Sequence, residues 1–203
     1  MAELARPRRG HFDLGTGYHG DLWLDLDALF LRPALLRPHV QWLAARLRGH
    51  RIDAVCGPME GGAFLAQAIA TVLGTAFLPA YRVPAARPAE PAQPAQPAAY
   101  RLPPVTGGIS GWRVAITDDA VNAGTAIAAC LGQLHKAGAV PVAVGALLAV
   151  GPAHTTVADT MALPFYPAGT IESHAWPAGR CPLCASGTQL TGGTGPAESG
   201  QHR

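Results

Sequence analysis

The chain of 203 residues carries 15 Lys and Arg against 13 Asp and Glu, and 49% of its residues are hydrophobic. This length suits one α/β domain with a single sizeable core. The formal net charge of +2 does not indicate a nucleic-acid-binding surface, and we expect no nucleic-acid partner. The longest apolar run, residues 139–150, is too short to cross a bilayer, and no apolar segment follows the basic N-terminus. We therefore expect a cytoplasmic protein without membrane association.

The first elements in the chain are a short strand and a helix. Residues 10–30 are rich in glycine and aromatic residues, and alternation over 22–26 predicts an edge strand. A helix is expected over 35–50, with Pro38 in its first turn and an apolar stripe along one side.

A glycine-rich loop follows the next strand. That strand is predicted over 52–56, and the helix after the loop should end at Gly74. Free N–H groups in such a loop suit an anion, but these residues alone leave open a loop that only needs tight turns. The loop consists of Gly57, Pro58, Met59, Glu60, Gly61 and Gly62.

The strand predicted over 75–82 leads into a segment of low complexity. From 83 to 104 the chain consists mainly of Ala, Pro and Gln, which bury too little apolar surface to become ordered. We predict a flap over 83–111 that is disordered or polyproline-like.

A strand, loop and helix over 113–127 carry the most specific pattern. Asp118 and Asp119 end the strand, and the helix begins near Gly124 or Thr125. The first N–H groups of that helix lack intrahelical acceptors and suit a phosphate. The two carboxylates are suitable acceptors for a pair of sugar hydroxyls. The pattern predicts a ribose phosphate site, and the alternative is an ordinary turn with two solvated acids.

This stretch resembles the signature of the type I phosphoribosyltransferases, and is most similar to that of orotate phosphoribosyltransferases. Some of those enzymes carry a very similar Asp-Asp-x-x-x-Ala-Gly-Thr-Ala. The resemblance implies that Asp118 and Asp119 hold the ribose hydroxyls of phosphoribosyl pyrophosphate (PRPP) and act in catalysis. The residues implied for its 5′-phosphate are Val121, Asn122, Ala123, Gly124, Thr125 and Ala126.

The resemblance also implies a fold. It is an α/β fold of the type I phosphoribosyltransferase kind, with a doubly wound, mostly parallel sheet, helices on both faces and a small N-terminal hood. We expect one domain over 1–185, with the hood at 10–30 and the flap at 83–111, and a disordered tail over 186–203.

Other segments match the family in part. Phe12 and His19 fall on matching positions of its base-covering hood, and the 57–62 loop resembles its pyrophosphate loop, where Glu60 is a departure. Tyr81-Arg82 resembles the start of the family's mobile catalytic loop. The lysines expected in that loop are absent, so Arg82, Arg87 and Arg101 are the candidate catalytic cations.

Cofactor and assembly follow from the same resemblance. Mg²⁺ is expected to be carried by PRPP with no direct protein ligand, and a homodimer is expected. A strand is predicted over 140–150, and a last strand over 162–166. In the family, the end of the first of these strands commonly carries an Arg that contacts orotate, whereas this chain has Val150-Gly151-Pro152 there. The function implied is transfer of phosphoribose from PRPP to a nucleobase, orotate first, in pyrimidine synthesis. The alternatives are another base or a non-catalytic PRPP-binding regulator.

Two other nucleotide-binding patterns are excluded. A P-loop needs G-x-x-x-x-G-K-[ST], and Lys136, the only lysine, follows His135. The glycine spacing at 15–20 fits a dinucleotide fingerprint, but no apolar strand precedes it and no helix follows it.

The four cysteines indicate no metal centre by themselves. Cys56 and Cys130 lie in apolar segments, and Cys181 and Cys184 form a single Cys-Pro-Leu-Cys pair. One such pair is weak evidence for zinc, so free thiols are expected. Some orotate phosphoribosyltransferases have a similar pair near the C-terminus.

Overall fold

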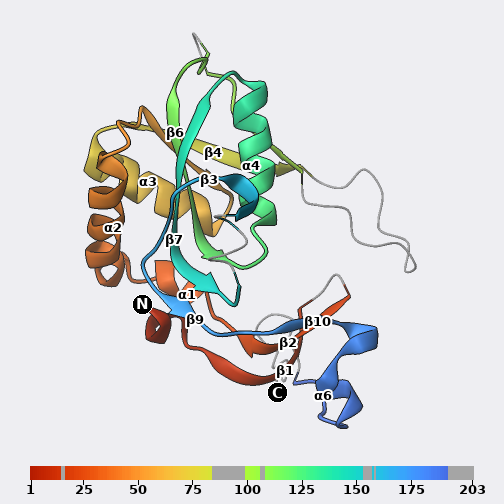
Figure 1. Ribbon diagram of the computed structural model, residues 1–203. Coiled ribbons are helices and arrows are strands. Elements are labelled where there is room, and N and C mark those ends of the chain that lie inside the picture. The colour runs from red at the N-terminus through yellow and green to blue at the C-terminus, as the bar shows by residue number, and fades with distance from the viewer. Residues whose placement is uncertain (15–16, 84–98, 106–107, 153–156, 158, 192–203) are drawn as a thin grey trace, which may run out of the picture.

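The computed structural model describes the chain apart from residues 15–16, 84–98, 106–107, 153–156, 158 and 192–203. A large sheet lies at its centre, and a smaller sheet lies below it in Figure 1. The strands of the large sheet are β3 (Ala54–Pro58), β4 (Ala76–Val83), β5 (Ala99–Arg101), β6 (Arg113–Val121), β7 (Val140–Val150), β8 (Phe165–Pro167) and β9 (Thr170–Ile171).

The large sheet is mostly parallel, as predicted. Its order is β5-β4-β3-β6-β7-β8, with β9 also paired to β7. Among the described strands of this sheet, the β4–β5 pair is antiparallel and the other pairs are parallel. The chain proceeds from β3 outward to β4, and later from β6 outward to β7. The winding direction therefore reverses between β3 and β6, which is where ligands bind in open α/β sheets.

Helices cover both faces of this sheet, which confirms the predicted doubly wound α/β class. On one face lie α2 (Pro33–Arg48) and α3 (Gly61–Leu73), and on the other lies α4 (Thr125–Lys136) (Figure 1). The strand residues alternate between the two cores: Ala115 packs on the α2–α3 side, while Ile116 packs on the α4 side. Strand β7 is buried over nearly its whole length because both of its faces are covered.

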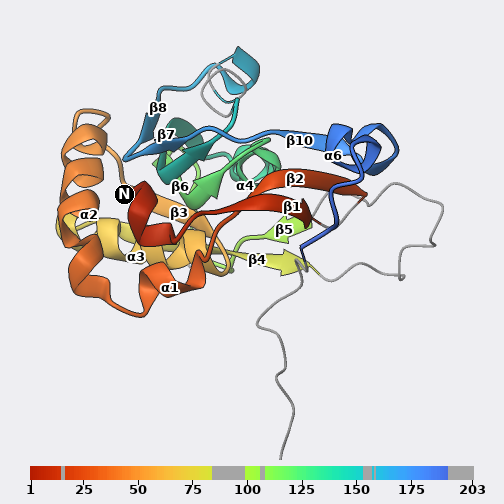
Figure 2. The same ribbon diagram turned by 90° about the horizontal axis from the view of Figure 1, so that it is seen from below.

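The smaller sheet forms the hood. Strands β1 (Arg8–Asp13), β2 (Tyr18–Trp23) and β10 (Ala175–Pro177) pair antiparallel in the order β1-β2-β10 (Figure 2). The N-terminal segment begins with a short helix, η1 (Ala2–Ala5), and α1 (Asp27–Phe30) links the hood to α2. After β10 the chain continues through η2 (Ala178–Arg180) and α6 (Pro182–Ala185). The hood therefore joins the two ends of the described chain.

Several boundaries differ from the sequence prediction. The strand predicted at the hood edge lies in the middle of its sheet, because β10, more than 150 residues later, pairs with its outer side. Helix α2 begins at Pro33, so Pro38 lies inside the helix and not in its first turn. The last predicted strand, 162–166, is found only in part, as β8 at Phe165–Pro167, and two further short strands, β9 and β10, follow it.

The flap and the tail also differ from expectation. Ala99–Arg101, inside the predicted flap, forms β5 on the edge of the large sheet; residues 84–98 lie outside the described residues. The tail predicted as disordered from 186 hydrogen-bonds to β1, since the Thr191 N–H donates to the His11 carbonyl. Within the described ranges we find no helix with the length and apolar character needed to span a bilayer.

Candidate functional site

Two loops meet at the carboxyl ends of β3 and β6, where the sheet reverses its winding direction. The 57–62 segment spans the end of β3, a two-residue connection and the start of α3, and residues 122–124 connect β6 to α4. Strand β6 continues to Val121, two residues beyond the acidic pair that was expected to end it. Because β3 and β6 are parallel neighbours, their carboxyl ends lie at the same edge of the sheet. The structure therefore places two of the predicted site segments beside each other.

The predicted acidic pair lies within this edge. Asp118 is 8% exposed, and Asp119 is half-buried. The Asp119 N–H donates to Oδ1 of Asp118 at 3.0 Å, and the Ala120 N–H donates to Oδ1 of Asp119 at 2.7 Å. These backbone bonds hold the two carboxylates in place.

The glycines of the 57–62 loop allow α3 to approach the acids closely. A Cβ atom at Gly61 would collide with the Asp119 carboxylate, and one at Gly62 would lie 2.6 Å from Oδ1 of Asp118. A Cβ at Gly57 would collide with the Gly62 backbone. The loop is also tied to β4, because the Met59 N–H donates to the Ala80 carbonyl at 2.8 Å, and the peptide bond after Met59 is cis. A Cβ atom at position 57, 61 or 62 would therefore force the atoms around it to move apart.

Burial dominates the electrostatics of the acidic pair. Burial raises the pKa of Asp118 well above its ordinary value of 3.8, and the Asp119 charge raises it further. Burial also raises the pKa of Asp119, where Asp27 adds a like charge, although the hydrogen bond from Ala120 acts in the opposite direction. Among the described residues, neither member of the pair forms an ion pair with a basic side chain. The site thus favours a ligand that brings hydrogen-bond donors or positive charge.

The phosphate loop predicted over 121–126 runs from the end of β6 into α4. Gly124 is the N-cap residue at φ +71, and α4 begins at Thr125 with no side chain bonded to its N-terminus. A left-handed φ favours glycine, and Val157 and Met161 also leave little room for a Cβ there. Asn122, Ala123 and Thr125 are exposed. The start of α4 therefore offers free N–H groups at the surface.

The candidate cations lie at the base of the flap. Arg82 on β4 pairs across the ladder with Tyr100 on β5, and the Arg101 guanidinium lies 5.0 Å from the ring centroid of Tyr81. Arg87 lies outside the described residues. Burial raises the pKa of Tyr100, and the negative charge of Asp118 raises it further. The flap base is therefore close enough to the acidic pair to be coupled to it electrostatically.

The two predicted base-binding residues lie in the hood. Phe12 is 1% exposed and lies 6.0 Å, between ring centroids, from Trp23. His19 is half-buried, and its Nδ1 faces His11 and Cys184. Direct contact of either residue with a base stays a prediction.

Two hollows lie away from these loops. One of about 570 Å³ lies between α1, α2 and α3, and one of about 910 Å³ lies between the N-terminal segment and α1. Neither is lined by the acidic pair or by the two glycine-containing loops. The candidate site is thus defined by its polar groups and not by one of these hollows.

Known proteins resemble this chain in sequence and in fold. No protein-family model matches the sequence. An orotate phosphoribosyltransferase from Caldanaerobacter subterraneus subsp. tengcongensis is 25% identical over 182 residues, which covers 90% of this chain and 87% of that protein. An adenine phosphoribosyltransferase from Thermobifida fusca is 30% identical over 141 residues, covering 65% of this chain and 77% of that protein.

The chain belongs to the type I phosphoribosyltransferase family.

Solved structures of other phosphoribosyltransferases have the same fold. The adenine phosphoribosyltransferase of Thermoanaerobacter pseudethanolicus superposes with a TM-score of 0.64 at 18% identity, covering 83% of this chain and 96% of that one. The orotate phosphoribosyltransferase of Aeropyrum pernix gives 0.61 at 20% identity, covering 83% and 93%. The resemblance inferred from the sequence is confirmed at the level of family and fold. The relatives are named for two different bases, orotate and adenine.

Two residues that are coupled to the acidic pair through charge were not recognised from the sequence. Asp27, the first residue of α1, raises the pKa of Asp119 through its like charge, although 92 positions separate the two residues in the chain. Tyr100 lies at the flap base, and the charge of Asp118 raises its pKa. No local pattern indicates either residue, because each reaches the site through a different element. Only the placement of α1 and β5 reveals them.

Proposed function

We propose that the chain is a phosphoribosyltransferase that binds PRPP at the β3–β6 edge and transfers its phosphoribosyl group to a nucleobase. The observation that carries the proposal is the acidic pair, which lies between the glycine loop at the start of α3 and the start of α4. The acids and the helix starts are assigned to different parts of PRPP because their charges differ. Carboxylates accept hydrogen bonds from sugar hydroxyls, while helix N-termini bind phosphates.

Each segment has a separate part in the proposed complex. Asp118 and Asp119 accept the two ribose hydroxyls, and residues 121–126 bind the 5′-phosphate through N–H groups and the Thr125 hydroxyl. The 57–62 loop binds the pyrophosphate through its N–H groups. The exposed side chain of Glu60 makes no cap bond to α3, which leaves the loop N–H groups accessible to an anion.

The proposed reaction is substitution at C1 of the ribose. A ring nitrogen of the base forms a bond to C1 while the bond from C1 to the pyrophosphate oxygen breaks, and pyrophosphate leaves with that electron pair. Such a reaction depends on positioning and on stabilising the departing charge. Arg82 and Arg101 at the flap base are the described cations that can contribute, and Arg87 stays a candidate.

The acidic pair also fits the Mg²⁺ expected with PRPP. Its oxygen donors are those that Mg²⁺ prefers, and burial without a cationic partner disfavours two negative charges there. Mg²⁺ bound to PRPP would supply neutralisation of the pyrophosphate charge. The expected homodimer and cytoplasmic location stay predictions.

Orotate is the first candidate base, and it is supported by the relatives of that name that span most of the chain. The Val150-Gly151-Pro152 end of β7 and the lysine-free flap favour two alternatives: another base, or PRPP binding without transfer. The adenine phosphoribosyltransferase relative makes adenine the second base to test.

The test combines binding with turnover. Calorimetry of the protein with PRPP and Mg²⁺ should show saturable binding, and incubation with orotate, adenine and further bases should release pyrophosphate with one of them. Failure to bind PRPP would refute the site. Binding without turnover on any base would favour the regulator, and turnover with a base other than orotate would correct only the substrate.

A further inference from the structure

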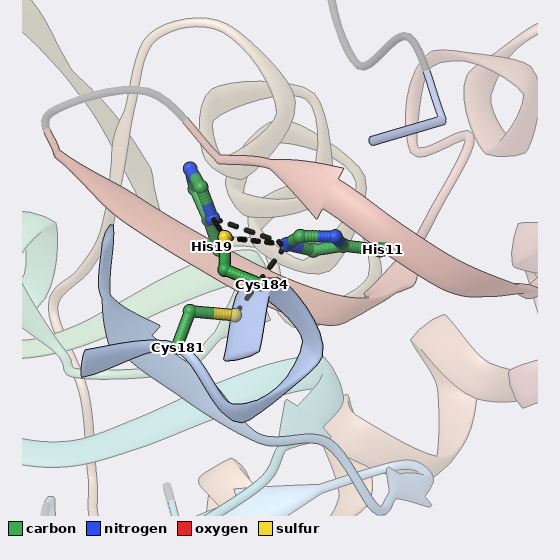
Figure 3. A group of neighbouring side chains, drawn as sticks. All are labelled: His11, His19, Cys181 and Cys184. Atoms are coloured by element: carbon green, nitrogen blue, oxygen red, sulfur yellow. Dashed lines mark hydrogen bonds between the residues drawn. The ribbon is translucent and has the colours of Figure 1, made fainter. Parts of the chain in front are cut away.

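Four side chains from opposite ends of the chain meet in the hood (Figure 3). His11 lies on β1 and His19 on β2. Cys181 immediately precedes the short α6 turn, and Cys184 lies within it. One ligand atom from each, a ring nitrogen or a sulfur, lies within 4.8 Å of the other three. None of the four belongs to the acidic pair or to the loops around it.

The spacing of these atoms matches a tetrahedral metal site. Nε2 of His11 lies 3.1 Å from Nδ1 of His19, 3.4 Å from Sγ of Cys181 and 3.7 Å from Sγ of Cys184. Sγ of Cys184 lies 3.2 Å from Nδ1 of His19. Zinc–nitrogen bonds of about 2.0–2.1 Å and zinc–sulfur bonds of about 2.3 Å at tetrahedral angles separate two nitrogens by about 3.3 Å and a nitrogen from a sulfur by about 3.6 Å.

The orientation of His11 favours metal binding. Its Nδ1 lies 2.7 Å from the Thr188 carbonyl oxygen, which can only accept a hydrogen bond, so Nδ1 carries the proton. In the neutral ring, Nε2 then presents its lone pair to the other three ligand atoms. A histidine that ligates a metal commonly donates its other N–H to a carbonyl in this way. His11 is also 1% exposed, so the ring is held in this orientation by its surroundings.

The fold positions the two cysteines independently of any metal. Trp176 on β10 pairs with His19, and the Ala178 N–H donates to the Gly17 carbonyl at 2.9 Å, which brings the C-terminal segment onto the hood. In the α6 turn, the Ala185 N–H donates to the Cys181 carbonyl at 3.1 Å. Residues three apart on a helical turn face the same side, so both thiols point toward the histidines (Figure 3).

We propose that His11, His19, Cys181 and Cys184 bind one Zn²⁺ ion. Two thiolates and two imidazoles at tetrahedral spacing are a zinc donor set, and four protein ligands leave no position open for a substrate. The ion is therefore structural, and it connects the C-terminal segment to β1 and β2. Cys184 is exposed and provides the path of entry, while Cys181 is 3% exposed. Coordination through Nδ1 leaves Nε2 of His19 available to a base.

This proposal replaces the expectation of free thiols at Cys181 and Cys184. That expectation rested on a single Cys-x-x-Cys pair, because the two histidines lie more than 160 positions earlier in the chain. The proposal is also independent of PRPP binding, so either one can fail without the other.

The experiment measures metal in the untagged full-length protein, purified under reducing conditions without chelators. We expect about one zinc per chain by mass spectrometry of the metal. After exchange for Co²⁺, we expect the visible absorption of a tetrahedral site together with thiolate-to-cobalt charge transfer. Zinc below about a tenth of an equivalent, with no such cobalt spectrum after reconstitution, would overturn the proposal.

Single substitutions test which side chains bind the zinc. Cys184→Ser changes an exposed side chain and should fold, yet weaken zinc binding by more than the roughly 10–100-fold that loss of an outer partner costs. His11→Asn should do the same, while Cys56→Ala and His135→Ala remove a thiol and an imidazole outside the cluster and should keep one zinc. Full zinc content in folded Cys184→Ser would overturn the assignment. A Cys181–Cys184 disulfide in the unreduced protein, with no zinc uptake after reduction, would also overturn it.

Discussion

The sheet edge that carries Asp118 and Asp119 (the acidic edge) and the group of His11, His19, Cys181 and Cys184 (the hood cluster) bring their side chains together in opposite ways. At the edge, the acids, the phosphate loop and the start of α4 are contiguous in the chain, and the second loop joins them because β3 and β6 are neighbours. In the hood, β1 and β2 meet a segment that is separated from them by 165 positions between His19 and Cys184. A site whose residues are contiguous in the sequence can be recognised by its pattern. A site assembled from both ends of the chain becomes visible only when the strand pairing is known.

The largest effect is expected from removing the charges of the acidic pair. In the double variant Asp118→Asn, Asp119→Asn, PRPP affinity should fall by more than about 100-fold, because hydrogen bonds to charged groups contribute about 1.5–3 kcal/mol each. Calorimetry measures the loss, and Glu3→Gln, an exposed carboxylate on η1, is the matched control. Zinc content should stay unchanged in the double variant. Wild-type affinity for PRPP would remove the acids from the site.

A smaller loss is expected when the approach of α3 is blocked. Gly61→Ala places a methyl group against the Asp119 carboxylate, and such overpacking costs about 1–3 kcal/mol. We expect weaker PRPP binding by about 5–150-fold, measured by calorimetry on protein with an unchanged far-UV spectrum. Gly132→Ala in α4 meets no atom within 4 Å and should leave affinity unchanged. Equal affinity in both variants would show that the close contact has no part in binding.

Metal removal should affect the hood and spare the acidic edge. After chelation, amides of β1 and β2 should exchange hydrogen faster, while those of β6 and β7 should keep their protection, because local openings have their own free energies. Hydrogen exchange read by mass spectrometry separates these segments. Cys184→Ser should reproduce the pattern without chelator. Faster exchange over the whole chain would instead make the hood part of one cooperative unit with the large sheet.

The smallest expected effect is a gain in stability on neutralising Asp118. Because its folded pKa is raised above 3.8, this carboxyl contributes most to stability when protonated, below its unfolded pKa, and the contribution is lost as the pH rises through the folded pKa. Asp118→Asn cannot ionise, and its amide oxygen can still accept the Asp119 N–H. At neutral pH its Tm should therefore exceed that of the wild type, by about 2–4 °C for each kcal/mol.

The pH dependence gives the control for this effect. The difference in Tm between Asp118→Asn and the wild type should shrink when both are compared below pH 3.8, where the wild-type carboxyl is protonated. Glu3→Gln should change the Tm little at either pH, because its carboxyl is exposed. A wild type more stable than Asp118→Asn at neutral pH would contradict the inferred cost of burying this charge.

Much of the large sheet could be predicted from local patterns. The β7 strand was expected over 140–150 and is found there, because a strand covered on both faces needs an unbroken apolar run. The start of α4 was expected at Gly124 or Thr125, since only a small-residue turn links the acids to the first helical residues. The resemblance to the phosphoribosyltransferases rested on these same contiguous residues.

What local patterns could not provide depends on contacts between distant segments. The central position of β2 in the hood requires β10, and the environment of Asp119 requires Asp27 from α1. Sequence alone was enough to predict a ribose phosphate site at the end of β6, because the acids and the following helix start lie close together in the chain. Tertiary structure alone decided that His11 and His19 face Cys181 and Cys184, because pairing between β2 and β10 brings the two ends of the chain together.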